Sequence, residues 1–212
     1  MKKILSFLLV ICMFVTLSAC GKKAEETGTT GDANNGTSTL ESDDLIGLMS
    51  SENYYVKYTM ESELEGTAYN AKGETARKGE DIAVSTEMEY NGAVMKTRTV
   101  KVGGESYVVD DTNKTITKSI VDIGDAANKA FDYSTVNKTG NGKGTIKGKE
   151  LPYTEYTTSE GYVSKFYTDN GKPYAIESTG EGVTAIMIVE EYSKNPPSSL
   201  FELPSDYTKV AY

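Results

Sequence analysis

The sequence predicts a mainly β fold of the α+β class, in which an antiparallel sheet is combined with few helices. Apolar and polar residues alternate with a period of two along most of the chain after residue 53, which is typical of half-buried strands. Turn dipeptides such as Asn91-Gly92 and Asn170-Gly171 separate these stretches and favour hairpins. Strands joined by short turns form antiparallel sheets, which can expose one face to water.

The start of the chain has the anatomy of a signal peptide. Lys2 and Lys3 give a positive end, residues 4–19 form an apolar run, and small residues precede a possible cleavage site. The run is shorter than the roughly 20 residues that an apolar helix needs to cross a bilayer. A permanent membrane span is therefore the less favoured interpretation, and we expect residues 1–19 to be removed.

A cysteine follows this segment directly. Leu17, Ser18 and Ala19 before Cys20 match the bacterial lipobox, and only cysteine supplies the thiol nucleophile that lipidation requires. Two acyl chains anchor a protein stably, whereas one chain binds reversibly. We therefore expect a palmitate-type anchor on Cys20 and a location on the extracytoplasmic face of the cell membrane. The alternative is an incidental cysteine in a signal that is cleaved elsewhere or stays as an anchor.

Charge and cysteine content restrict the partners. Cys12 is removed with the signal, so the mature chain keeps Cys20 alone and forms no internal disulfide. The whole chain has a net charge of −9, which becomes more negative when Lys2 and Lys3 are lost. This charge disfavours nucleic acid as a partner. We expect contact with the membrane through the lipid anchor.

The mature chain divides into a linker and one domain. Residues 20–44 hold the cysteine and a polar stretch without aromatic residues, which cannot bury enough surface to fold. Residues 45–212 form the domain, which begins with a short helix near residue 45. Period-two patterns then predict an antiparallel meander of strands at 54–61, 67–77, 82–90, 94–102, 106–110 and 115–120.

A helix and further strands are expected in the second half. Apolar residues recur at helical spacing over 120–131, so we expect a helix that lies across the sheet. A polar, glycine-rich loop is expected from there to Lys149, followed by strands at 151–158, 162–168 and 174–178. The stretch VTAIMIVEEY at 183–192 is apolar on both sides, which places it in the middle of the sheet. Leu200, Phe201 and Leu203 then return to the core.

These features resemble a known group of proteins. The strand order, the helical insert, the strands YTEYTTSEGYVSKFYTDNGKPYAIES and the closing LFELPSDYTKV are similar to the LolA, LolB, LppX and LprG lipoprotein-carrier superfamily. The resemblance covers roughly residues 45–212. It implies a curved antiparallel half-barrel around lid helices, a cavity for acyl chains, and no catalytic residues. The periplasmic carriers of this superfamily are unanchored, whereas Cys20 would tether this chain.

The residue types present favour a protein that is not an enzyme. The chain contains no histidine, which excludes histidine-based triads and His-ligated zinc sites. No cofactor or metal is expected, because a turn explains the acidic residues at 110–113 better than a calcium loop does. The alternative is a glycosidase with paired carboxylates, although solvated strand faces explain these residues, namely Glu87, Glu89, Glu190 and Glu191.

Tyrosine and methionine supply the candidate binding site. Methionine suits pockets of variable shape, and tyrosine is abundant on the expected strands. We therefore expect a hydrophobic ligand, such as a lipid, to contact Tyr58, Met60, Met88, Tyr90 and Met187. The alternative for these residues is ordinary core packing. The alternative function is a cell-envelope interaction or sensing module without a ligand cavity.

The anchor can be tested by replacing its thiol. We expect Cys20→Ala to release the protein from membranes, because no nucleophile remains to accept the acyl chains. Membrane fractionation and metabolic labelling with palmitate measure this release. Cys12→Ala should leave both readouts unchanged, since Cys12 lies in the removed segment. A Cys20→Ala protein that stays membrane-bound as before would contradict the anchor.

Overall fold

The computed structural model describes most of the predicted domain. The described residues are 47, 51–64, 67–90, 93–120, 122, 137–157, 161–180 and 183–210. The predicted signal peptide and the linker with Cys20 lie outside these ranges. So does the predicted helix at 120–131, apart from Ile120 and Asp122. No helix in the described ranges is long and apolar enough to cross a membrane.

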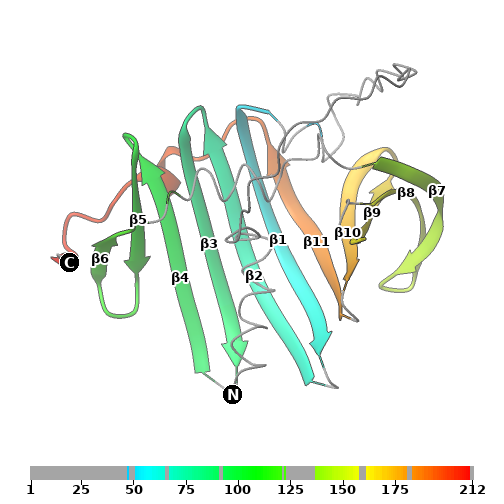
Figure 1. Cartoon of the computed structure of the whole chain (residues 1–212), viewed down its shortest axis with the longest axis horizontal. Coiled ribbons are helices and arrows are strands. Elements are labelled where there is room, and N and C mark those ends of the chain that lie inside the picture. Colours follow the sequence, from blue (N-terminus) through cyan, green and yellow to red (C-terminus); the bar gives the residue numbers. More distant parts are fainter. Residues whose placement is uncertain are drawn as a thin grey trace, which may run out of the picture.

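One sheet of twelve strands organises the described residues (Figure 1). The first six strands are β1 (Asn53–Leu64), β2 (Thr67–Lys78), β3 (Asp81–Tyr90), β4 (Ala93–Val102), β5 (Glu105–Asp110) and β6 (Thr115–Lys118). The others are β7 (Asn137–Ile146), β8 (Lys149–Thr157), β9 (Val163–Asp169), β10 (Lys172–Gly180), β11 (Val183–Ser193) and β12 (Thr208–Val210). The predicted curved, mainly β fold is confirmed.

The strand order joins the two halves of the chain at the centre of the sheet. The order is β12-β6-β5-β4-β3-β2-β1-β11-β10-β9-β8-β7, and every neighbouring pair is antiparallel except β12 with β6. The meander predicted for the first six strands is therefore confirmed. So is the central place of β11, which pairs with β1 and β10. Its Met187 and Ile188 pack into clusters on opposite faces of the sheet.

The prediction of a loop up to Lys149 is wrong for residues 137–146, which form the edge strand β7. Glycines weaken a strand and conceal its alternation, because they have no side chain to pack. Here tyrosines occupy the free space. A Cβ atom on Gly142 or Gly144 would lie 2.7 Å from the hydroxyl oxygen of Tyr153 or Tyr167, respectively. The glycine positions therefore make room for two aromatic rings.

The C-terminal segment, residues 198–210, covers part of one sheet face. The short 3-10 helix η2 (Ser198–Phe201) places Phe201 in a buried cluster with Val100 and Val109 of the sheet, and Leu200 and Leu203 pack against it, as predicted. Arg98 Nη1 donates a hydrogen bond of 3.1 Å to the carbonyl oxygen of Glu202. β12 then pairs with β6. The chain thus closes this face with its own residues.

Two glycines of β7 provide a matched test of the packing. A Cβ atom on Gly144 would meet the hydroxyl of Tyr167, which donates to Glu177 at 3.0 Å, so we expect Gly144→Ala to lower the free energy of unfolding by about 1–3 kcal/mol. Gly140→Ala should be neutral or slightly stabilising, since the nearest atom lies 4.0 Å away. Urea denaturation measures both. Equal stabilities would contradict the close approach.

Candidate functional site

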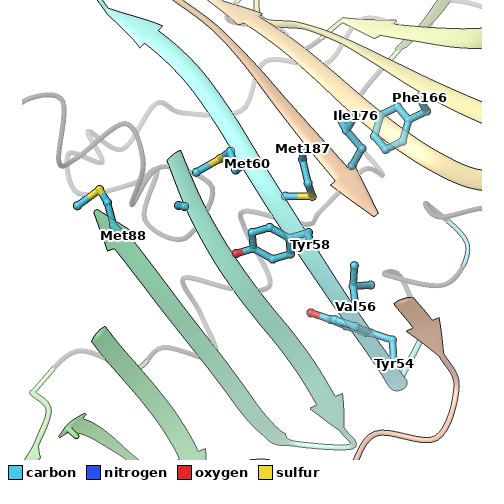
Figure 2. Close-up of a cluster of buried hydrophobic side chains, with 9 residues drawn as sticks. Tyr54, Val56, Tyr58, Met60, Met88, Phe166, Ile176 and Met187 are labelled. Carbon is cyan, nitrogen blue, oxygen red and sulfur yellow. The ribbon is translucent and has the colours of Figure 1, made fainter. Parts of the chain in front are cut away.

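The candidate site lies on the sheet face that carries the methionines, here called the methionine face. Alternation along β1 places Tyr54, Val56, Tyr58 and Met60 on this face. Figure 2 shows these side chains together with Met88, Phe166, Ile176 and Met187. All eight belong to one buried hydrophobic cluster, to which Ala71 also belongs. The face therefore carries apolar side chains from both halves of the sheet.

The strand register aligns the centre of this cluster in one row across six strands. Met60 is paired with Ala71 on one side and with Met187 on the other. The row continues from Ala71 to Met88, and from Met187 through β10 to β9. Directly paired residues in antiparallel strands have neighbouring side chains. The methionine row is therefore Phe166, Ile176, Met187, Met60, Ala71 and Met88.

The structure brings together four of the five predicted ligand-contacting residues. Met60, Met88 and Met187 share the methionine row and are only 5%, 9% and 4% exposed, while Tyr58 lies in the next row of the same face. Tyr90 ends β3, and its side chain is outside the description. Their proximity places these residues at one site, and ligand contact stays a prediction.

Tyr58 is fixed by its neighbours. Its partner in β2 is Gly73, and a Cβ atom there would lie 2.4 Å from the Tyr58 ring, so the ring covers the glycine. The side chains of Thr75 and Thr86 hydrogen-bond with the Tyr58 hydroxyl. Burial raises the pKa of Tyr58, and it raises the pKa of Tyr54 in the same way. Both phenols are therefore held neutral.

Phe166 and Ile176 were missed as site residues by sequence reasoning. Their strands were predicted, and alternation within a strand assigns a face. Alternation does not show which residues of distant strands share a row, because that depends on register. Tyr156 packs against the same cluster and meets Phe166 edge to face, with ring centroids 5.4 Å apart. The aromatic pair extends the apolar surface to β8.

Charged side chains lie mainly away from the methionine row. Arg77 and Lys101 share the row of Tyr54, near the start of β1. The Lys101 ammonium lies 3.0 Å from Asp122 Oδ2, and Arg77 Nε donates to the carbonyl oxygen of Gly79. The row that begins with Tyr54 is about 20 Å from the methionine row, since a strand rises about 3.3 Å per residue.

The carboxylates considered for catalysis lie elsewhere. Glu87 and Glu89 are on the opposite face, where Glu87 forms an ion pair of 2.8 Å with Lys96. Asp110 accepts hydrogen bonds from the backbone amides of Thr112 and Asn113, which is the arrangement of a turn. Within the described ranges, no group of three or more histidine, cysteine, aspartate or glutamate side chains could hold a metal ion.

Comparison with solved structures identifies chains of similar architecture. An uncharacterized conserved protein from Thermus thermophilus is 14% identical, with a TM-score of 0.47, and the match covers 79% of this chain and 94% of that one. A LolA superfamily protein from Nitrosomonas europaea is 10% identical, with a TM-score of 0.35 and coverages of 73% and 91%. LprF from Mycobacterium bovis is 9% identical, with a TM-score of 0.40 and coverages of 71% and 89%.

The similarity to these structures is low, with TM-scores below 0.5 and identities of 14% or less. The twelve-stranded sheet of this chain is open, with β12 and β7 at its two edges. No protein-family model and no curated protein sequence matches the chain.

The buried phenols predict instability at high pH. Tyr54 and Tyr58 ionise in the unfolded chain near pH 10, whereas burial keeps them protonated in the folded chain. The unfolded state then binds fewer protons, so the stability is complete below about pH 10 and falls as the pH rises above it. Urea denaturation at about pH 9 and pH 11 measures the slope. Tyr54→Phe should flatten it, and an unchanged slope would contradict this assignment.

Proposed function

We propose that the protein is a membrane-anchored, extracytoplasmic lipoprotein that binds the hydrocarbon chain of a lipid on its methionine face, without covalent chemistry. The observation that carries this proposal is the methionine row, a continuous line of apolar side chains across six strands. A row of this kind presents apolar contacts along the width of the sheet. Its direction matches an elongated ligand.

Methionine supports this proposal through its chemistry. Its unbranched thioether side chain adapts to irregular shapes, so methionine-rich surfaces accept ligands that vary in form. Hydrocarbon chains are such ligands, since their length and bends differ. Burial of each methylene group contributes about 0.8 kcal/mol, so a chain of ordinary length supplies enough driving force for stable binding. Tyr58 and Tyr54 add rigid apolar surface beside the row.

The proposed anchor determines where the lipid would come from. The 24 residues from Gly21 to Asp44, treated as a flexible coil, span about 27 Å. This length keeps the domain near the bilayer that carries the anchor. Lipid from that membrane is therefore the natural ligand, and long-distance transport is not part of the proposal.

A second function is favoured by the outer end of the methionine face. Met95, Val108 and Val210 are 41%, 42% and 46% exposed, and each is paired through the register with this face. Exposed apolar side chains of this kind suit a protein partner in the envelope. An interaction or sensing module would use this end and would hold no lipid.

Met88 offers a test of the lipid function. We expect diphenylhexatriene, an apolar fluorophore, to bind the mature chain carrying Cys20→Ala and to be displaced by hexadecane. Met88→Gln keeps the side-chain size but adds an amide to the apolar row, so we expect about tenfold weaker binding, which corresponds to about 1.4 kcal/mol. Glu89→Gln is the matched control, because Glu89 is exposed on the opposite face.

Organic extraction provides an independent measurement. Mass spectrometry of the extract from purified protein should detect a lipid in stoichiometric amount. A lipid-free protein that binds no fluorophore would contradict the proposed function and favour the interaction module.

A further inference from the structure

A row of small polar side chains lies beside the methionine row on the same face. Ser62 is two residues after Met60 in β1, and it pairs with Ala185 of β11. Ala185 pairs with Ser178 of β10, which pairs with Ser164 of β9. We call these four residues, Ser62, Ala185, Ser178 and Ser164, the serine row. Two residues of a strand span about 6.6 Å, which separates the two rows.

Ser62 has an unusual hydrogen-bonding state. Its Oγ atom is buried and has no hydrogen-bond partner. Among the described side chains, this is the one buried polar atom in that state. A buried hydroxyl without a partner is costly, and such groups are rare in native proteins. The hydroxyls of Ser164 and Ser178, by contrast, lie 3.0 Å apart and bond to each other. A ligand atom that hydrogen-bonds with Ser62 would remove the cost.

Ala185 is the small apolar residue beside this hydroxyl, and it is itself only 8% exposed. It separates Ser62 from Ser178, so the Cα atoms of the two serines lie about 10 Å apart, two strand spacings. The methyl side chain between them can hydrogen-bond with neither serine. A polar group of a ligand that lies over Ala185 would therefore reach serine hydroxyls on both sides.

The charge of the row restricts the ligand. Tyr156 of β8 continues the serine row beyond Ser164, and Tyr69 of β2 continues it beyond Ser62. From β8 to β2, therefore, no side chain in this register is charged. The basic residue in the same register is Lys138, which is exposed on the edge strand β7. A phosphate or carboxylate over Ala185 would be a buried charge without a counter-charge, which is strongly unfavourable. An uncharged polar group has no such cost.

We infer that the serine row binds the uncharged, hydroxyl- or ester-bearing head of a neutral glycerolipid, whose hydrocarbon chain lies along the methionine row. This inference rests on the proposed lipid function and specifies its ligand class. Ser62 supplies the hydrogen bond that selects the head. The methionine row supplies the apolar contacts that any hydrocarbon chain would share.

Three probes of equal chain length separate these contributions. We expect a monoacylglycerol to displace diphenylhexatriene at three- to tenfold lower concentration than the corresponding alkane, which is the gain from one neutral hydrogen bond. The lysophosphatidate with the same chain should bind more weakly than the monoacylglycerol. The two amphiphilic probes are measured below their micelle concentrations and the alkane below its solubility limit, each with the mature Cys20→Ala chain.

Ser62→Ala tests the residue itself and has a signature that general damage would not produce. The substitution removes an unpartnered buried hydroxyl, so the ligand-free protein should melt about 2–4 °C higher. Its affinity for monoacylglycerol should fall to that for the alkane, and alkane binding should stay unchanged. Ser85→Ala, on the opposite face of the central strand β3, is the matched control and should alter neither affinity.

The outcomes distinguish this inference from the proposed function. If no probe binds, the lipid function itself is contradicted. If alkane and monoacylglycerol bind equally and Ser62→Ala changes neither, the lipid function stands and the role of the serine row is overturned. Tighter binding of lysophosphatidate than of monoacylglycerol would also overturn it, because an anionic head would then be the preferred ligand.

Discussion

The pairing of β1 with β11 is the interaction on which the rest of the structure depends. The two strands are distant in the sequence but adjacent at the centre of the sheet (Figure 1). Val56 pairs with Tyr192, and an unbroken register from there would place Ile188 opposite Met60. The irregularity between Lys57 and Tyr58 shifts the register by one residue, so that Met187 takes this place. A one-residue shift exchanges the two faces of a strand, so the irregularity is what completes the methionine row.

The two faces of the sheet have different roles as a result. On the face opposite the methionines, the C-terminal segment buries Phe201, and the Tyr207 hydroxyl donates a 3.0 Å hydrogen bond to Asp111. Alternating charges such as Glu87 and Lys96 cover the solvent-exposed part of that face. These contacts stabilise the fold without involving the methionine face. A ligand on the methionine row, as proposed, would leave these contacts of the opposite face in place.

The sequence predicted those features that depend on a single strand. Alternation alone places Tyr58 and Met60 on one face, and apolar residues on both sides of β11 indicate its central position. Features that depend on several strands were not predictable in this way. Phe166 joins the methionine row only because three pairings align, and tyrosines from β8 and β9 fill the space at two glycines of β7. Both depend on register, which alternation does not fix.

Ser62 places a polar group on one side of the apolar methionine row. Other polar groups on the methionine face do have partners, since the Tyr58 hydroxyl bonds with Thr75 and Thr86, and Ser164 bonds with Ser178. A buried polar group without a hydrogen-bond partner is expected at a ligand-binding site, because the bound ligand supplies the missing partner. In the proposed binding mode, the apolar row and the unsatisfied hydroxyl found among the described residues would distinguish the two ends of an amphiphile. Apolar contact would then supply affinity, and the hydroxyl would determine the orientation of the ligand.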